Sequence, residues 1–131
     1  MQWEDGVNLG FSDGRPCDLY LPVDHSLNAP TVAAQEADPS SLLNTVRAIL
    51  ALRHQEEDLE ADAPFNVVCS EPGRPFVYKR GKLLCAVNPT GSELEVALPQ
   101  NIAGAVLFEI GNVRAADGIL TVGAQSFAVI K

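Results

Sequence analysis

The sequence is poor in the residues that build metal centres, disulfide frameworks and nucleic-acid surfaces. Its 131 residues include 2 histidines, 3 cysteines and 9 lysines and arginines, against 17 aspartates and glutamates. The resulting net charge of -8 argues against nucleic acid and anionic membrane surfaces as partners. No run of about 18 apolar residues occurs, so no membrane-spanning helix is expected.

Cysteine usage points to a reducing compartment. Cys17, Cys69 and Cys85 form no C-x-x-C pair, and an odd number of cysteines cannot close a disulfide framework. The first residues also lack the basic and apolar regions of a signal peptide. We therefore expect a cytoplasmic protein with reduced thiols, in which Cys69 and Cys85 are small buried side chains rather than redox or metal ligands.

A stretch without glycine or proline leaves room for one helix. Proline is absent between Pro39 and Pro64, and the preceding Asp38-Pro39 pair is a typical helix start. Apolar residues then recur at the 3–4 spacing of one buried stripe, which predicts a helix over about 39–54. The stripe consists of Leu42, Leu43, Val46, Ile49 and Leu50, with Arg53 at its end.

The segments on either side of this helix have no helical pattern. Glu56, Glu57, Asp58, Glu60 and Asp62 form an acidic run, which opposes the dipole at a helix C-terminus and predicts a solvated linker ending at Pro64. The first 37 residues predict neither a helix nor a long strand. A leader of that length is typical of functional loops or of pieces of a larger structure, so we expect the chain to be incomplete.

After Pro64 the apolar residues alternate with a period of two, as in strands with one solvated face. Runs of this character are separated by turns rich in Gly, Pro, Asn and Asp. They cover residues 65–69, 76–80, 82–87, 93–98, 105–110, 119–122 and 126–130. The strand pattern alone suits an antiparallel sandwich or a barrel. The predicted fold class is mainly β with an N-terminal helix, with about 6–8 strands in an antiparallel β-sandwich.

The carboxylates do not assemble into a self-contained active site. Glu4 and Asp5 are adjacent, so their side chains diverge instead of facing each other across a sugar, and we interpret them as a solvated pair. Asp24-His25-Ser26 contains the residue types of a hydrolase triad. Sequence neighbours cannot align as nucleophile, base and orienter, however, so we assign this tripeptide to chance composition.

Metal and cofactor signals are equally weak. His54 lies near Glu56 but has no second histidine at i+4, so no metal site is expected. No G-x-G-x-x-G or P-loop spacing is present, and no cofactor is expected. Trp3, Phe11 and Tyr20 could stack on sugar rings, although aromatics that anchor a loop on a hydrophobic body are the commoner case.

Five ordered sequence blocks fill the first 53 residues. They read Met1-Gln2-Trp3-Glu4-Asp5-Gly6 with Asn8-Leu9-Gly10-Phe11-Ser12, Leu19-Tyr20-Leu21-Pro22-Val23, Thr31-Val32-Ala33-Ala34-Gln35, Asp38-Pro39-Ser40-Ser41-Leu42-Leu43-Asn44, and Ala51-Leu52-Arg53. These blocks resemble the M-Q-W-D…N-A-G-F-S, L-Y-L-P-V, N-V-E-A-Q, D-P-x-S-x-L-N and A-L-R segments of glycoside hydrolase family 13, the α-amylase family. The nearest subgroups are oligo-1,6-glucosidases, α-glucosidases and trehalose synthases.

The resemblance implies a place at the end of a (β/α)8 barrel. Residues 1–63 would be the loop after the eighth strand and the last barrel helix, and residues 64–131 the C-terminal antiparallel β-sandwich. The catalytic Asp, Glu and Asp of the family lie on earlier strands, so no catalytic residue is carried over to this chain. Gln2 and Trp3 would lie near the active-site mouth of the parent enzyme, as weak candidates for substrate contact. Glu4 and Leu9 replace the usual Asp and Ala, which leaves the substrate open.

Three hypotheses follow. The leading one makes the chain the non-catalytic C-terminal region of an α-glucosidase-like enzyme, inactive alone, whose missing barrel is its partner. The parent would act on α-glucosidic bonds of an α-glucan or oligosaccharide with retention, and the β-domain would stabilise the barrel. The alternative is a free-standing carbohydrate-binding β-module that uses exposed aromatics, for which the candidates are Phe76, Tyr78, Phe108 and Phe127. An interaction domain without a link to sugars is the third.

The helix stripe needs a cover if the barrel is missing. A bare apolar patch of that size favours association. We expect the stripe to fold onto the chain's own β-domain or to pair two copies of the chain as a homo-oligomer, through Leu42, Val46, Ile49 and Leu50.

Overall fold

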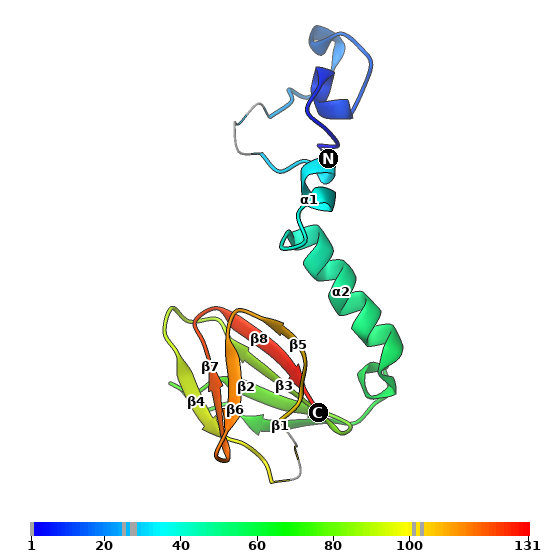
Figure 1. Ribbon diagram of the computed structural model, residues 1–131. Helices are drawn as coiled ribbons and strands as arrows, with labels where there is room; N and C mark the ends of the chain where they lie inside the picture. Colours follow the sequence, from blue (N-terminus) through cyan, green and yellow to red (C-terminus); the bar gives the residue numbers. More distant parts are fainter. Residues whose placement is uncertain (1, 25, 27–28, 101, 103) are drawn as a thin grey trace. The chain divides into compact units, whose positions relative to one another are not determined.

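The computed structural model describes residues 2–24, 26, 29–100, 102 and 104–131 (Figure 1). The chain divides into two compact units, Met1–Ala51 and Leu52–Lys131, and each is described by itself. In the described part of the chain, no helix is long and apolar enough to cross a membrane.

The unit Leu52–Lys131 is built from two antiparallel sheets. Its strands are β1 (Phe65–Cys69), β2 (Phe76–Arg80), β3 (Leu83–Asn88), β4 (Leu94–Ala97), β5 (Val106–Ile110), β6 (Val113–Ala116), β7 (Ile119–Val122) and β8 (Ser126–Ile130). One sheet has the order β1-β2-β3-β8-β5 and the other the order β4-β7-β6. Figure 1 shows the two sheets as stacked layers, which confirms the predicted antiparallel β-sandwich.

The core lies between the two sheets and follows from the alternation of side chains along each strand. Inward-facing residues of both sheets form one buried cluster, which contains Val77, Leu84, Ala86, Ala128 and Ile130 from the larger sheet and Val113, Leu120 and Val122 from the smaller. A second, smaller cluster on the opposite face of the larger sheet contains Leu83, Cys85 and Val129. The larger sheet is therefore apolar on both faces.

Seven of the strands match the predicted runs closely, whereas β6 was missed. Its sequence Val113-Arg114-Ala115-Ala116 holds a single β-branched residue, so its intrinsic strand propensity is low. The strand forms because Arg114 and Ala116 lie opposite Thr121 and Ile119 of β7. Strand β6 is therefore stabilised by its pairing with β7 rather than by its own strand propensity.

Helix α2 (Leu42–Gln55) begins three residues later than predicted. The reason is that Ser41, and not Asp38, caps the N-terminus of the helix. The Asp38 carboxylate accepts hydrogen bonds from the backbone amide and the hydroxyl of Ser40, at 2.9 and 2.7 Å. These bonds hold the pKa of Asp38 below its usual value. The N-cap role falls to Ser41, whose Oγ accepts the amide of Asn44 at 3.3 Å.

The acidic run was predicted to be a solvated linker. The structure shows that it also contacts the sandwich. It contains the 3-10 turn η3 (Glu57–Leu59). Asp58 Oδ2 accepts the backbone amide of Lys82 at 3.1 Å, and Glu56 forms an ion pair with Lys131 at 3.4 Å. Leu52 and Leu59 pack against the second cluster of the larger sheet. Two half-buried leucines, Leu52 before the acidic run and Leu59 within it, supply contacts that the charge pattern concealed.

The unit Met1–Ala51 contains α1 (Val32–Ala37) and the 3-10 turns η1 (Val7–Gly10) and η2 (Pro16–Asp18). The prediction of no helix before residue 38 is therefore wrong for α1. A helix of six residues is too short to show a periodic stripe. Its start is marked by Thr31, whose Oγ1 accepts the amide of Ala34 at 3.2 Å.

This unit has no apolar core in its described part. Its buried residues are Asn8, Thr31 and Ser41, all of them polar. Of the predicted helix stripe, Leu42 is 73% exposed, Val46 and Leu50 are also exposed, and Ile49 is half-buried. The stripe is thus not covered from within its own unit.

Candidate functional site

Gln2 and Trp3, the two predicted site residues, lie in a short extended segment that holds helix α1. The Trp3 amide donates to the carbonyl of Leu9 at 2.9 Å. The carbonyls of Gln2 and Trp3 accept the amides of Val32 and Ala33 at 3.0 and 2.9 Å. Those amides belong to the first turn of α1, which has no acceptors within the helix. The segment therefore anchors α1 through its backbone and leaves the Trp3 side chain 49% exposed.

The loop after Trp3 is fixed by Asn8. Its side chain is buried, and Nδ2 donates to the carbonyls of Ser12 and Gly14, both at 2.7 Å. Asn8 and Leu9 have φ values of 51° and 53°, in the left-handed region that asparagine tolerates better than most residues. One buried amide thus closes the loop from residue 8 to residue 14.

Gly10 brings this loop against the site segment. Its φ is 67°, and a Cβ at this position would lie 2.8 Å from Glu4 Cγ and 3.2 Å from Trp3 Cβ. Only glycine combines that conformation with such a close approach. The position of Trp3 therefore depends on Gly10.

A second set of polar contacts joins α1 to α2. Asn44 Nδ2 donates to the carbonyls of Gln35 and Asp38 at 2.9 and 2.8 Å. The Ser41 hydroxyl donates to the same Gln35 carbonyl at 2.6 Å, and Gln35 Oε1 accepts the amide of Leu43 at 3.1 Å. Gln35 and Asn44 set the turn between the two helices.

Two hollows border the Gln2–Trp3 segment. One, of about 250 Å³, lies beside the Leu19–Val23 block and is lined by Gln2, Asn8, Leu9, Phe11, Leu19, Leu21, Pro22, Val23 and Asp24. Gln2 Nε2 donates to the Asp24 carbonyl at 3.2 Å across this region. Four of the five sequence blocks, all but Ala51–Arg53, are thus joined into one structure around Gln2 and Trp3.

The other hollow is larger and mostly apolar. Its volume is about 760 Å³, and it is lined by Gln2, Trp3, Pro30, Val32, Gln35, Glu36, Leu42, Leu43, Val46 and Arg47. The two charged lining residues, Glu36 and Arg47, pair with each other at 2.9 Å. A paired carboxylate in a wide apolar hollow offers a packing surface rather than an acid–base pair.

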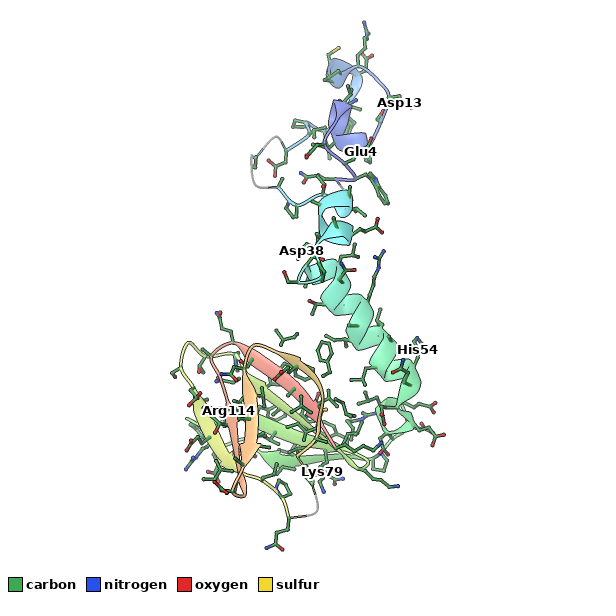
Figure 2. The ribbon with its side chains drawn as sticks, viewed as in Figure 1. Glu4, Asp13, Asp38, His54, Lys79 and Arg114 are labelled. Atoms are coloured by element: carbon green, nitrogen blue, oxygen red, sulfur yellow. The ribbon has the colours of Figure 1, made fainter. Side chains whose placement is uncertain are left out.

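The remaining candidates do not converge. Glu4 and Asp5 are exposed, and Glu4 lies beside the η1 turn (Figure 2). The Asp24 carboxylate accepts the amide of Ser26 at 2.9 Å in a local turn, and His25 lies outside the described residues. His54 is exposed on the last turn of α2. In the described part of the chain, no three His, Cys, Asp or Glu side chains are grouped as metal ligands would be.

The aromatic candidates lie in both units. Phe11 and Tyr20 are exposed in the first unit. Phe76, Tyr78, Phe108 and Phe127 share the outer face of the five-stranded sheet, where the ring centroids of Phe76 and Tyr78 are 5.5 Å apart and those of Phe108 and Phe127 are 6.3 Å apart. Their rings are tilted by 36° and 54°. They do not form one flat platform.

Sequence reasoning missed Asn8, Gln35 and Asn44 as the residues that position this segment. The first carried a signal, because asparagine is common in turns and tolerates the left-handed conformation. Gln35 and Asn44 end two of the sequence blocks, but the sequence did not show their structural role. Gln35 Oε1 accepts the backbone amide of Leu43, and Asn44 Nδ2 donates to backbone carbonyls, which only the fold brings together.

No family model matches the chain. The probable oligo-1,6-glucosidase 2 of Bacillus subtilis is 36% identical over 80 residues, which are 61% of this chain and 14% of the relative. The trehalose synthase/amylase TreS of Mycobacterium tuberculosis is 41% identical over 59 residues, 42% of this chain and 10% of the relative. The chain is a relative of the glycoside hydrolase family 13 enzymes.

The fold agrees with this family-13 relationship. The trehalulose synthase MutB from Pseudomonas mesoacidophila matches 99% of this chain, with a TM-score of 0.79 and 23% sequence identity. The match covers 24% of the MutB chain. The chain therefore spans about a seventh of the length of this oligo-1,6-glucosidase and about a quarter of the solved protein.

Proposed function

We propose that this chain is the non-catalytic C-terminal region of an α-glucosidase-like enzyme of glycoside hydrolase family 13. Residues 1–63 form the end of the catalytic barrel, and residues 64–131 form a β-sandwich that stabilises it. The whole enzyme cleaves or transfers α-glucosyl units of an oligosaccharide with retention. Gln2 and Trp3 lie at the edge of its substrate site.

One observation carries this proposal: among the described residues of the unit Met1–Ala51, those that are buried are polar, and an apolar helix stripe is exposed. A free-standing domain needs a buried apolar core to offset the conformational entropy of its chain. Polar contacts between backbone blocks fix the shape of this unit, and its apolar hollow and stripe both require a cover. An apolar surface of a barrel would bury both the hollow and the stripe.

The carbohydrate-binding module is the weaker candidate. A sugar platform needs exposed, roughly coplanar aromatic faces, and the rings on the five-stranded sheet are tilted against one another. Pairing of two chains through Leu42, Val46, Ile49 and Leu50 is a second way to cover the helix stripe when the barrel is absent. Titration calorimetry tests the binding module, and sedimentation tests the pairing of two chains.

The decisive experiment is to sequence the DNA upstream of the first codon of this chain. We expect an open frame that encodes a barrel with three catalytic carboxylates. The purified 131-residue chain should hydrolyse neither maltose nor isomaltose and should give no heat with either sugar, or with soluble starch, in titration calorimetry. Hydrolysis by the clean chain would contradict the proposal, and heat on titration would favour the binding module. A dimer in sedimentation would favour pairing.

A further inference from the structure

The chain contains three Asp-Gly pairs, Asp5–Gly6, Asp13–Gly14 and Asp117–Gly118. All of these residues are exposed to solvent. Aspartate before glycine is prone to isomerise, because glycine has no side chain to shield its backbone nitrogen from the neighbouring carboxyl group. The reaction requires the peptide group between the two residues to rotate, so the fold decides which pair can react.

The chemistry of this isomerisation needs only water. The glycine nitrogen attacks Cγ of the aspartate and forms a new C–N bond, and a carboxyl oxygen leaves as water with the amide proton and one proton from solvent. The product is a cyclic succinimide. A second water molecule opens the ring at one of its carbonyl carbons, restores the amide proton and returns the other proton to solvent. Opening at the main-chain carbonyl gives isoaspartate, in which the main chain is longer by one methylene group.

The fold restrains the pair Asp13–Gly14 at the reacting atom itself. The Gly14 amide, whose nitrogen would be the nucleophile, donates to Ser12 Oγ at 3.0 Å. The Gly14 carbonyl accepts Nδ2 of the buried Asn8 at 2.7 Å, which closes the loop around the pair. Rotation of the peptide toward the Asp13 carboxylate breaks the bond to Ser12. Asp13 is therefore protected while this loop is closed.

The pair Asp117–Gly118 is restrained by the sandwich. It forms the two-residue turn between β6 and β7, with the φ values of 52° and 75° that suit a type I′ hairpin turn. Ala116 and Ile119, on either side of the turn, are paired strand partners. The Gly118 carbonyl also accepts the amide of Leu98 at 2.8 Å. Its peptide can rotate only when a hairpin of the apolar-core unit opens, and such opening is costly.

The pair Asp5–Gly6 has neither restraint. In the part of the chain that the structure describes, the Asp5 carboxylate and the Gly6 amide have no hydrogen-bond partner. Gly6 is extended, with a φ of 178°, and its carbonyl accepts the amide of Leu9 at 3.1 Å. That bond belongs to the next peptide group, so the reacting peptide can rotate without breaking a hydrogen bond of its own.

We propose that Asp5 is the residue at which this chain isomerises to isoaspartate, through attack of the Gly6 nitrogen on Asp5 Cγ. The added methylene group enters the loop that the bond between the Trp3 amide and the Leu9 carbonyl closes. The Trp3 carbonyl in turn accepts the amide of Ala33 in α1. Isoaspartate at position 5 therefore loosens the anchor of α1. This assignment does not depend on the proposed function, and its tests use the 131-residue chain.

The first test compares the three positions within one chain. The folded chain is incubated at physiological pH and temperature, and electron-transfer fragmentation in mass spectrometry locates isoaspartate at each position. We expect it to form at Asp5 about fivefold faster than at Asp13 or Asp117, which is the factor that one net hydrogen bond contributes to an opening equilibrium. In urea, the three positions should react at similar rates.

Two results of this comparison would overturn the assignment. One is a folded chain in which Asp13 or Asp117 isomerises as fast as Asp5. The other is a preference for Asp5 that persists unchanged in urea, because the neighbours in sequence, and not the fold, would then set the rate.

Ser12→Ala tests why Asp5 reacts before Asp13. This variant removes the acceptor of the Gly14 amide and keeps the Ser12 carbonyl to which Asn8 donates. We expect isomerisation at Asp13 to become about fivefold faster, with no change at Asp5. Ser40→Ala is the matched control, since the Ser40 hydroxyl donates to Asp38 and not to an Asp-Gly pair, and it should change neither rate. An unchanged rate at Asp13 in Ser12→Ala would refute protection by this hydrogen bond.

Asp5→Glu tests the consequence for α1. Glutamate keeps the charge but cannot form the succinimide ring. After incubation, the amides of Val32 and Ala33 should exchange hydrogen faster in the unsubstituted chain than in Asp5→Glu, because their acceptors are the Gln2 and Trp3 carbonyls. Asp117→Glu is the control and should behave like the unsubstituted chain. Equal exchange in the unsubstituted chain and in Asp5→Glu would show that the longer loop leaves the α1 anchor intact.

Discussion

Among single residues, Asn88 contributes most visibly to the sandwich. It is 1% exposed, and its Nδ2 lies 2.7, 2.8 and 3.0 Å from the carbonyls of Gly123, Ser92 and Val122. Its Oδ1 accepts the amide and the hydroxyl of Thr90, at 3.0 and 2.7 Å. One side chain thus joins the β3–β4 turn to the end of β7 and satisfies backbone groups that are shielded from water.

We expect Asn88→Ala to lower the free energy of unfolding by about 3 kcal/mol, because it leaves buried carbonyls without donors. Urea unfolding followed by circular dichroism measures the change. Asn66→Ala, at an exposed position on β1, is the control. Its free energy of unfolding should stay within about 0.5 kcal/mol of that of the unsubstituted chain. A similarly small effect at Asn88 would show that water replaces its hydrogen bonds.

Burial has a different effect on Cys85, because it makes this side chain chemically unreactive. It is 2% exposed, and desolvation raises the pKa of its thiol. The neighbouring Tyr78 is affected in the same way, with burial and then Cys85 raising its pKa to about 12. Both groups are therefore neutral at physiological pH, and Cys85 is the small, unreactive core side chain that its apolar surroundings in the sequence predicted.

At the scale of elements, the start of α2 depends on residues outside the helix. The Asn44 side chain connects α2 to the carbonyls of Gln35 and Asp38. We expect Asn44→Ala to destabilise this junction by about 1–2 kcal/mol, since the carbonyls of Gln35 and Asp38 each lose one of their two donors and keep only Ser41. Hydrogen exchange at the amides of Leu43 and Asn44 should speed up accordingly.

Arg53→Ala, at the exposed far end of the same helix, serves as the control for this junction. It should leave exchange at residues 43 and 44 unchanged, since it removes no contact of the α1–α2 turn. Faster exchange in both variants would mean that the whole helix opens as one unit, and that Asn44 has no special role in its start.

The elements that the sequence predicted are those with a local cause. The alternation in β4 and the helical stripe of α2 follow from residues within each element. Strand β6 and helix α1 were not predictable in this way. The first is held by pairing with β7, and the second by the Gln2 and Trp3 carbonyls, which are about thirty residues away in the chain. Contacts with a neighbouring strand or with a distant segment leave no periodic trace within the element itself.

The same limit applies to the candidate site. The family resemblance pointed to Gln2 and Trp3 as site residues. Asn8 and Gly10 belong to the same sequence block, but their role in holding Gln2 and Trp3 became visible through φ values and a close approach. The polar network of Gln35 and Asn44 depends on the turn between two helices. A motif identifies which residues matter, and the fold shows how they are held in place.

At the scale of the whole molecule, the two units should differ in resistance to unfolding. The unit Met1–Ala51 has no buried apolar residue in its described part, whereas Leu52–Lys131 contains the entire apolar core. Local opening costs least where little apolar surface is buried. We therefore expect the first unit to open long before the sandwich when the chain is isolated.

Limited trypsin digestion reads out this difference directly. Arg15 and Arg74 precede prolines and resist cleavage, so the accessible sites are Arg47 and Arg53 in α2 and the basic residues of the sandwich. We expect the first cut after Arg47, because its half of α2 belongs to the unit without an apolar core, and a stable fragment of residues 48–131 or 54–131 in mass spectrometry. Arg47→Gln should shift the first cut to Arg53 without exposing the sandwich. Early cleavage after Arg80 or Lys82 would instead show that the sandwich opens as readily as the first unit, and that its apolar core does not make it more resistant.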